Sequence, residues 1–317
     1  MNNEEELISI VIVNWNSGNQ LSDAINSIIR YHKGLISSVI IVDNASNDNS
    51  MTFIKYLKDL PFLLDIICNS ENLGFGFACN QGAAKVKSEF ILFLNPDTQL
   101  YDNSISVPLA FMKRPNNKAI GICGIKLVDE HNNFSVSAAR FPTLRVMAGK
   151  ILGLNKLFPR LLPSHLMSED ELSVSQYVEQ VIGAFFLIRK SVFDACCGFD
   201  ERFFVYFEEV DLSLRAKKLG HSSYYLSEAS AFHKSGGCSG GIKATRLFYS
   251  LRSRIQYAQK HYTYIELGCL FVLTALEFPL RLFHGMIKFS GSDIMNTFSA
   301  YKQFFTYFTR IGSGIDR

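Results

Sequence analysis

The sequence predicts an α/β fold, in which a doubly wound, mostly parallel sheet precedes a C-terminal extension of amphipathic helices. In the first half of the chain, short apolar runs alternate with segments of helical periodicity. This alternation is typical of parallel strands that helices cover on both faces. Asp and Asn residues directly follow several of the apolar runs, and residues 243–317 combine basic charge with aromatic residues at helical spacing.

The elements follow one another regularly up to about residue 100. We expect strands at 7–13, 39–42, 64–68 and 90–94, because each is a continuous run rich in Ile, Val, Leu or Phe. Helices are expected from 21 to 29, at 51–60 and at 78–87. Residues 126–180 are less regular and contain an acidic, polar stretch at 168–175, which we interpret as a mobile or acceptor-facing insertion. A further buried strand is expected at 181–188 and a helix at 191–196.

Charge divides the 317 residues into two parts. Residues 243–317 hold ten Lys and Arg against four Asp and Glu, a net charge of +6, whereas residues 1–242 carry −3. The overall charge of +3 is too small for the broad basic footprint of a nucleic-acid-binding protein. We therefore expect a ligand-binding domain over residues 1–242, composed of parts 1–125 and 126–242, and a helical tail over residues 243–317.

The sequence of the tail, residues 243–317, predicts helices that lie on a surface and do not cross a bilayer. Its longest uncharged run, 267–276, has ten residues, whereas a spanning helix needs about 20. A polar stripe then recurs at spacings of 3, 4, 3 and 4, formed by Thr274, Glu277, Arg281, His284 and Lys288. Such a helix either lies in the interface of an anionic membrane or packs its apolar face on the rest of the protein.

Compartment signals favour the cytoplasm. The seven cysteines are odd in number and include no CxxC pair, so neither a disulfide framework nor a zinc cage is indicated. That usage fits a reducing compartment. The N-terminal segment Met-Asn-Asn-Glu-Glu-Glu is acidic, and we expect no signal peptide there.

Three polar loops, at residues 14–18, 43–47 and 95–98, follow predicted strands. Ligands of open α/β sheets bind beyond the carboxyl ends of the strands, so the loops are predicted to meet at one site. Asp97 is the candidate metal ligand, because a carboxylate in this position suits Mg²⁺ or Mn²⁺, with substrate phosphates completing the coordination. Asn95-Pro96-Asp97 is also a good turn without any metal.

A second group of acids, Glu208, Glu209 and Asp211, starts a helical pattern. Acids at a helix start are favoured by the helix dipole, which is the structural explanation. The functional explanation is a general base that takes the proton of an acceptor hydroxyl. The aromatic residues at 203–207 are expected to form an apolar wall that raises the pKa of such a carboxylate.

His233 precedes the segment Lys234-Ser235-Gly236-Gly237. Backbone N–H groups of such a loop can hold phosphate, and a histidine at its edge can complete a metal site. The alternative is an ordinary surface histidine. Known nucleotide motifs are absent, because the GxGxxG pattern starting at Gly74 fails at Cys79 and neither GxxxxGK[ST] nor GxSxG occurs. These absences disfavour a nicotinamide oxidoreductase, a P-loop NTPase and an α/β-hydrolase.

Taken together, these segments resemble the inverting family 2 glycosyltransferases of GT-A fold, particularly the bacterial rhamnosyltransferase-like branch. The resemblance runs from about residue 7 to 240. It rests on Ile12-Val13-Asn14-Trp15-Asn16, Val42-Asp43-Asn44-Ala45-Ser46, Glu71-Asn72-Leu73-Gly74-Phe75, Leu94-Asn95-Pro96-Asp97-Thr98, Gly183-Ala184-Phe185, Gly198-Phe199-Asp200-Glu201, Glu208-Glu209-Val210-Asp211-Leu212 and His233-Lys234.

The resemblance implies a mixed, mostly parallel sheet, a nucleotide-diphospho-sugar donor, and Mg²⁺ or Mn²⁺ as cofactor. It implies that Asp97 contacts the metal and the donor diphosphate, that His233 assists there, and that Glu209 is the catalytic base with Asp211 as the next candidate. The remaining implied donor contacts are Asn14, Asp43, Asn72, Gly74 and Glu208.

Three positions depart from the family pattern. Asn95 stands in place of the first acid of the DxD motif, Glu209 in place of an Asp, and Cys196-Cys197-Gly198 where members commonly show Val-Gly-Gly. The first departure reduces the number of metal ligands and the second lengthens the catalytic arm.

The resemblance implies transfer of a sugar, most simply L-rhamnose from dTDP-L-rhamnose, to a lipid-linked glycan or oligosaccharide in cell-surface polysaccharide synthesis. The enzyme is then expected in the cytoplasm, peripheral on the inner face of the cytoplasmic membrane. The alternatives are another donor sugar (GlcNAc, galactose or glucose) or a non-catalytic nucleotide-sugar-binding protein. A nucleotidyltransferase is disfavoured, because no basic glycine-rich N-terminal loop is present to hold a triphosphate.

Overall fold

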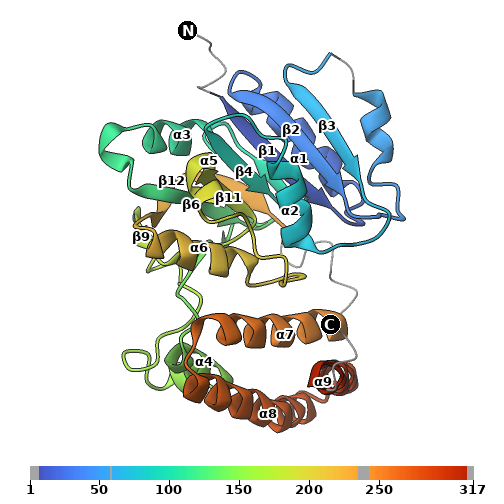
Figure 1. The fold of residues 1–317 in the computed structure, drawn as a ribbon, viewed down its shortest axis with the longest axis vertical. Coiled ribbons are helices and arrows are strands. Elements are labelled where there is room, and N and C mark those ends of the chain that lie inside the picture. The colour runs from blue at the N-terminus through green and yellow to red at the C-terminus, as the bar shows by residue number, and fades with distance from the viewer. Residues whose placement is uncertain (1–6, 58, 235–242, 313–317) are drawn as a thin grey trace. The chain divides into compact units, whose positions relative to one another are not determined.

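The computed structural model describes residues 7–57, 59–234 and 243–312, and the chain divides into two compact units. The sheet unit comprises Met1–Phe141, Leu166–Glu201 and Glu208–Cys238, and the helical unit comprises Pro142–His165, Arg202–Phe207 and Ser239–Arg317. The helical unit is therefore larger than the C-terminal segment alone, since two segments from the middle of the chain belong to it (Figure 1).

The sheet unit contains a mixed, mostly parallel sheet, as the sequence predicts. The strand order is β3-β2-β1-β4-β11-β6-β12-β5, and β3, β2, β1 and β4 are mutually parallel. β11 is antiparallel to both of its neighbours, and β12 is parallel to β6. The main strands are β1 (Ile8–Asn14), β2 (Ile36–Asp43), β3 (Leu63–Cys68), β4 (Phe90–Leu94), β5 (Thr98–Leu100), β6 (Ile120–Val128), β11 (Phe185–Arg189) and β12 (Ser222–His233). Short strands are β7 (Phe134–Ser135), β8 (Ala138–Ala139), β9 (Gln176–Val178) and β10 (Gln180–Val181).

Helices cover both faces of this sheet, so it is doubly wound. Ile10 and Ile12 of β1 face one core, which α1 and α3 complete, while Val11 and Val13 face the other, which α2, α5 and α6 complete. The alternation follows from the two-residue period of a strand. The helices are α1 (Gln20–His32), α2 (Phe75–Ala83), α3 (Ser106–Met112), α5 (Lys190–Ala195) and α6 (Glu208–Lys218).

Some expected elements differ in the structure. The helix expected at 51–60 is only a 3₁₀ turn, η2 (Thr52–Tyr56), because the backbone becomes extended at Leu57 and Asp59 has φ +51°. The strand expected at 181–188 is interrupted: Val181 pairs with β8, and Ile182 donates its N–H to the Ser137 carbonyl before β11 begins. β6 and β12 were not predicted. Further short turns are η3 (Pro115–Asn117) and η4 (Leu154–Lys156).

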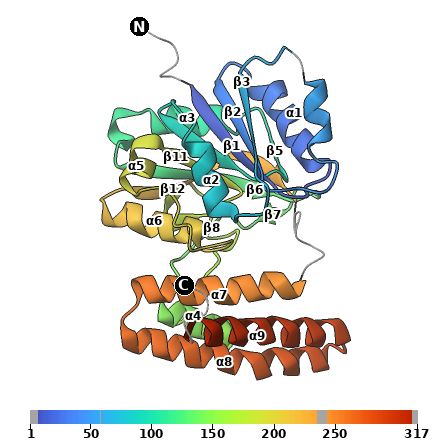
Figure 2. The ribbon, with the colours of Figure 1, turned by 45° about the vertical axis from the view of Figure 1, so that its right-hand side comes forward.

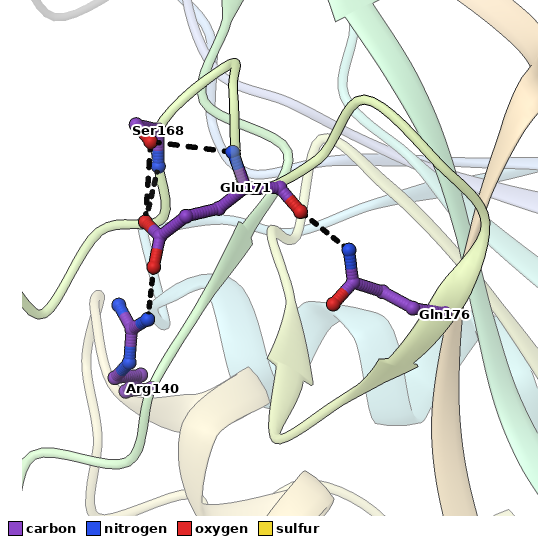
Figure 3. A network of polar contacts seen from close by, with 4 residues as sticks. All are labelled: Arg140, Ser168, Glu171 and Gln176. Atoms are coloured by element: carbon purple, nitrogen blue, oxygen red, sulfur yellow. Dashed lines mark hydrogen bonds and ion pairs between the residues drawn. The ribbon is translucent and has the colours of Figure 1, made fainter.

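The acidic stretch at 168–175, within the part expected to be a mobile or acceptor-facing insertion, makes several hydrogen bonds (Figure 3). Glu171 accepts a hydrogen bond from the Ser168 N–H at 2.9 Å, and its carboxylate also pairs with Arg140. Gln176 donates to the Glu171 carbonyl. Although partial burial would raise the pKa of Glu171, the hydrogen bonds from Ser168 and the pairing with Arg140 hold it below its ordinary value.

The helical unit packs four helices around one core (Figure 2). α9 contacts both α7 and α8, and α4 packs on α8. Val146, Met147 and Ile151 of α4 contribute to the core together with Leu251 of α7 and Leu270 of α8. The helices are α4 (Leu144–Ile151), α7 (Lys243–His261), α8 (Tyr264–Ile287) and α9 (Gly291–Gly312). None of the described helices combines the length and apolarity that crossing a bilayer requires.

Candidate active site

The strand ends that were predicted to meet do lie at one edge of the sheet. β1 pairs in parallel register with β2 on one side and with β4 on the other, and Asn14 is opposite Asp43. Asn44 donates its N–H to the Asn14 carbonyl at 2.8 Å, and Asn69 donates to the Asp43 carbonyl at 2.9 Å. The loops after β1, β2 and β3 are thus held together by backbone hydrogen bonds as well as by side chains.

Asn14 is the centre of the polar side chains at this edge. Its side chain is fully buried, and its amide nitrogen lies 2.7 Å from Asp43 Oδ1 and 2.8 Å from Ser50 Oγ. The amide oxygen accepts a hydrogen bond from Ser17. The second carboxylate oxygen of Asp43 accepts from the Ser46 N–H at 3.2 Å. Both polar ends of Asn14 are therefore occupied by protein atoms, and what this side chain does is fix the orientation of the Asp43 carboxylate.

Asn72 and Gly74 shape the start of α2. The Asn72 side-chain oxygen accepts hydrogen bonds from Asn44 Nδ2 at 2.9 Å and from the Gly74 N–H at 3.0 Å. Gly74 has φ 94° and ψ 163°, a conformation essentially restricted to glycine. Gly82, the residue before the end of α2, approaches β1 so closely that a Cβ would lie 2.4 Å from Val11 Cγ1. These two glycines set the close approach of α2 to the loops at the sheet edge.

Asp97 and His233, the two predicted metal ligands, lie side by side. β5 pairs with the end of β12 so that His233 is opposite Thr98, and the His233 Nε2 to Asp97 Oδ1 distance is 3.5 Å. Asp97 is 7% exposed, and its Oδ1 accepts no hydrogen bond from the described residues. The Asp97 carbonyl accepts from the Lys234 N–H at 3.1 Å. The segment Ser235–Gly237, expected to hold phosphate, lies outside the described residues.

The donor set fits a divalent cation that takes most of its ligands from substrate. A buried carboxylate oxygen without a partner is costly unless something binds it, and a carboxylate is a ligand that suits Mn²⁺ or Mg²⁺. Among the described residues no three His, Cys, Asp or Glu side chains are grouped to hold a metal. Diphosphate oxygens and water would have to complete the coordination.

A pocket of about 330 Å³ opens beside Asp97. Among its other lining residues, Lys234 belongs to the predicted His233-Lys234 motif. The remaining ones were not predicted: Gln20, Asp23, Gln99, Glu130 and Phe232. They escape sequence reasoning because they come from α1, β5, β12 and the turn after β6, which only the folded chain brings together. No sequence motif marks them.

Glu208 and Glu209 begin α6, and one carboxylate oxygen of each is buried without a hydrogen-bond partner in the described part of the chain. Burial and the charge of Glu209 raise the pKa of Glu208 well above its ordinary value, and burial raises the pKa of Glu209. Burial together with the charge of Glu208 in turn raises the pKa of Cys79 on α2. The aromatic residues 203–207, expected to wall these acids, belong to the helical unit.

Asp211 differs from the two glutamates. Its side chain is fully buried, and one oxygen lies 2.7 Å from Arg215 Nε. Arg215 in turn donates to the carbonyl of Cys196 at the end of α5. Asp211 therefore has a structural role between α5 and α6, and its carboxylate is not available to an acceptor.

A short segment connects the Glu209 group with the Asp97 group. A Cβ on Gly183 would lie 3.9 Å from the Cγ and Cδ atoms of Glu209, and the neighbouring Ala184 carbonyl accepts the Asn95 N–H at 3.1 Å. Gly183 thus lies near Glu209, and Ala184 is hydrogen-bonded to the first residue of the Asn95-Pro96-Asp97 turn. One carboxylate oxygen of Glu209 and one of Asp97 are buried without a hydrogen-bond partner among the described residues.

Comparison with known proteins is consistent with this chemistry. The model of the family described as glycosyl transferase family 2 matches residues 9–196. The N-acetylglucosaminyl-diphospho-decaprenol L-rhamnosyltransferase of Mycobacterium tuberculosis is 27% identical over 256 residues, which cover 76% of this chain and 80% of that protein. Rhamnosyltransferase WbbL of Escherichia coli is 26% identical over 219 residues, covering 64% and 79%.

Solved structures share the fold at lower sequence identity. The mannosyltransferase PcManGT from Pyrobaculum calidifontis, in complex with GDP-Man and Mn²⁺, has a TM-score of 0.57 and 11% identity, covering 94% of this chain and 86% of its own. GalNAc-T7 with UDP, GalNAc and Mn²⁺ has a TM-score of 0.56 and 15% identity, covering 74% and 44%. The shared architecture confirms the predicted GT-A type of sheet.

Proposed function

Because this chain belongs to glycosyl transferase family 2, we propose that it transfers a sugar from a nucleotide-diphospho-sugar to a hydroxyl group of a lipid-linked glycan, with inversion at the anomeric carbon. The proposed donor is dTDP-L-rhamnose, and the proposed pathway is cell-surface polysaccharide synthesis. Two relatives are named as rhamnosyltransferases, and the name of one specifies a GlcNAc-diphospho-decaprenol acceptor.

The observation that carries the proposal is Asp97 beside His233. One carboxylate oxygen of Asp97 is buried without a hydrogen-bond partner among the described residues and lies 3.5 Å from His233 Nε2, so these two side chains would hold a divalent cation. A bound divalent ion would neutralise the charge that develops on the departing diphosphate. Asp43, which Asn14 holds by a hydrogen bond, is the proposed contact to the base or ribose, and Asn72 and Gly74 before α2 are the proposed further contacts to the nucleotide.

Glu209 is the proposed base, and Glu208 supports it from the donor side. The acceptor oxygen attacks the anomeric carbon, the bond from that carbon to the diphosphate oxygen breaks, and the acceptor proton passes to the Glu209 carboxylate. The nucleoside diphosphate leaves with the electron pair. Unlike Asp211, which is paired with Arg215, Glu209 has an oxygen without a partner among the described residues.

The lipid-linked acceptor implies a place of action. We propose that the enzyme works in the cytoplasm, peripheral on the inner face of the cytoplasmic membrane. The excess of Lys and Arg in residues 243–317 supports attraction to an anionic surface.

The test combines donor binding with transfer. Nucleotide-sugars are screened by thermal shift with Mn²⁺ or Mg²⁺, and dTDP-L-rhamnose should raise the melting temperature most, because a ligand of the native state stabilises it. Asp97→Asn should abolish the metal-dependent part of that shift, and the exposed Asp65→Asn should leave it unchanged. A larger shift with a GlcNAc, galactose or glucose donor would replace rhamnose in the proposal. Donor binding without transfer to any lipid-linked acceptor would indicate a binding protein.

A further inference from the structure

Helix α8 buries the first part of its polar stripe in the core of the helical unit, together with apolar residues such as Leu270. Thr274 and Glu277, which begin its polar stripe, are buried inside the helical unit, and Glu277 pairs there with Arg254. Farther along the stripe, Arg281 keeps 42% of its side chain exposed while its guanidinium pairs with Glu277. A helix on a water-exposed surface normally presents its charged residues to solvent and its apolar residues to the core.

The face opposite the polar stripe is apolar and exposed. Six large apolar residues recur there at spacings of 7, 4, 4, 3 and 4, and their exposed fractions lie between 44% for Leu280 and 80% for Ile265. At 1.5 Å per residue the row is about 33 Å long. We call this row the outer stripe of α8; it consists of Ile265, Val272, Leu276, Leu280, Phe283 and Ile287.

The outer stripe contains no charged residue, and no described segment of the chain covers it. Soluble proteins rarely expose a contiguous apolar surface of this kind unless it is an interaction site. Two observations on the same unit indicate which partner fits.

The first observation is the charge of the whole unit. Fifteen Lys and Arg stand against four Asp and Glu in its three segments, which gives +11, whereas the sheet unit carries −8. Pro142–His165 contributes Arg145, Lys150, Lys156 and Arg160 and no acid. The charge separation is therefore larger than the division of the sequence at residue 242 indicates.

The second observation is that this basic segment is itself apolar at its surface. Leu157, Phe158 and Leu161 are 53–71% exposed and lie next to the exposed Lys156 and Arg160 in the sequence. α4, which begins the segment, packs directly on α8. Exposed leucine and phenylalanine interspersed with cations is the composition of surfaces that lie in the headgroup region of anionic bilayers.

We propose that the outer stripe of α8 inserts into the interfacial layer of an anionic lipid bilayer, with the cations of the helical unit bound to lipid headgroups. In that position the apolar row leaves water and the buried Arg254–Glu277 pair remains inside the protein. The inference deepens the proposed membrane location. It is tested without donor or acceptor, so it stands or fails separately from glycosyl transfer.

The experiment measures binding of the full chain to vesicles by co-flotation. The probes are vesicles of phosphatidylcholine with 30% phosphatidylglycerol, and vesicles of phosphatidylcholine alone. The unmodified chain should bind the anionic vesicles, and binding should weaken with salt because screening reduces the headgroup attraction. Val272→Glu with Phe283→Glu should reduce the vesicle-bound fraction about tenfold or more.

Matched controls separate insertion from general effects of added charge. Tyr56→Glu with Leu63→Glu places the same two charges on exposed apolar positions of the sheet unit, 78% and 73% exposed, and should leave binding largely intact. Lys156→Gln with Arg160→Gln should weaken binding to anionic vesicles only. Circular dichroism checks that each variant is folded.

A depth probe tests insertion directly. Trp15 is the single tryptophan of the chain, so Phe283→Trp adds one reporter on the outer stripe, and brominated lipids should quench its added fluorescence. Equal vesicle binding by Val272→Glu/Phe283→Glu and the unmodified chain would overturn the proposal. The proposal would also be overturned if the unmodified chain bound no vesicles but formed a concentration-dependent dimer that the double substitution abolishes. The outer stripe would then be a contact between two copies of the chain.

Discussion

Glu277 of α8 and Arg254 of α7 form an ion pair inside the helical unit, with 2.7 Å between Glu277 Oε2 and Arg254 Nη2. Both side chains are only 9% exposed. Arg281, one turn further along α8, donates its Nε–H to the other carboxylate oxygen at 2.7 Å. Although burial alone would raise the pKa of Glu277, the two guanidinium groups lower it below its ordinary value.

Glu277→Gln should destabilise the helical unit by about 3–5 kcal/mol, because it leaves the Arg254 charge buried without a counterion. The lowered pKa adds a pH signature. The pair stabilises the folded state fully above the ordinary glutamate pKa of 4.5, and this contribution is lost as the pH falls through the lower folded-state value. Urea unfolding followed by circular dichroism should therefore show that the free energy of unfolding of Glu277→Gln is lower than that of the unmodified chain at pH 7. This difference should become smaller below pH 4.5. The exposed Asp293→Asn is the control, and a difference independent of pH would contradict the assignment.

Glu208→Gln should stabilise the protein at neutral pH, in contrast to Glu277→Gln. Burial and the Glu209 charge raise the pKa of Glu208, so above pH 4.5 the folded state binds more protons than the unfolded state and stability falls as the pH rises. Removing the ionisable group should raise the melting temperature at pH 7 by several degrees, at about 2–4 °C per kcal/mol for a unit of this size. The gain should vanish near pH 4. A variant that melts lower than the unmodified chain at pH 7 would show that the charge of Glu208 is stabilised.

Glu209→Gln should lower the rate of transfer by about 10²–10⁴-fold, the usual contribution of a general base. Donor binding, measured by thermal shift, should be unchanged. Because burial raises the pKa of Glu209, the rate of the unmodified enzyme should increase with pH through a value above 4.5. Near-normal turnover of Glu209→Gln would remove it as the base.

Asn14→Ala should cost about 2–3 kcal/mol of stability, because Asp43 and Ser50 lose the amide that bonds them in a buried position. Since a loosened Asp43 affects donor binding more than chemistry, KM for the donor should rise more than kcat falls. Asn19→Ala is the matched control, as Asn19 is exposed and its side chain does not cap α1. Equal effects of the two substitutions on KM would contradict the positioning role.

Gly74→Ala should destabilise the sheet unit by about 1–3 kcal/mol, because φ 94° with ψ 163° is strained for any residue with a Cβ. Gly34→Ala is the control, since a Cβ there meets nothing within 4 Å and its φ is not positive. Chemical unfolding at neutral pH distinguishes the two. If Gly74→Ala is as stable as Gly34→Ala, the loop before α2 has freedom to rearrange.

The sequence was most informative where local pattern and tertiary role coincide. β1, β2 and β4 are continuous apolar runs that are buried on both faces of the sheet, so their positions could be predicted from the sequence alone. The resemblance placed Asp97 and His233 at one metal site, and the pairing of β5 with β12 is what brings them together in the fold. The sequence did not predict that Asn14 bonds to Asp43 or that Asp211 pairs with Arg215, because these contacts form only when the chain folds. The stripe of α8 was read with the correct period, but periodicity does not say which face turns inward.

The division of the helical unit among three stretches of chain also bears on biosynthesis. Val146 and Met147 of α4 emerge from the ribosome about a hundred residues before Leu251 and Ile255, with which they share a core. Until α7 and α8 are made, that apolar helix has no permanent neighbours and is a natural substrate for chaperones. A chain stopped at residue 242 would keep α4 in this state, so the helical unit cannot be removed from the protein as a detachable appendage.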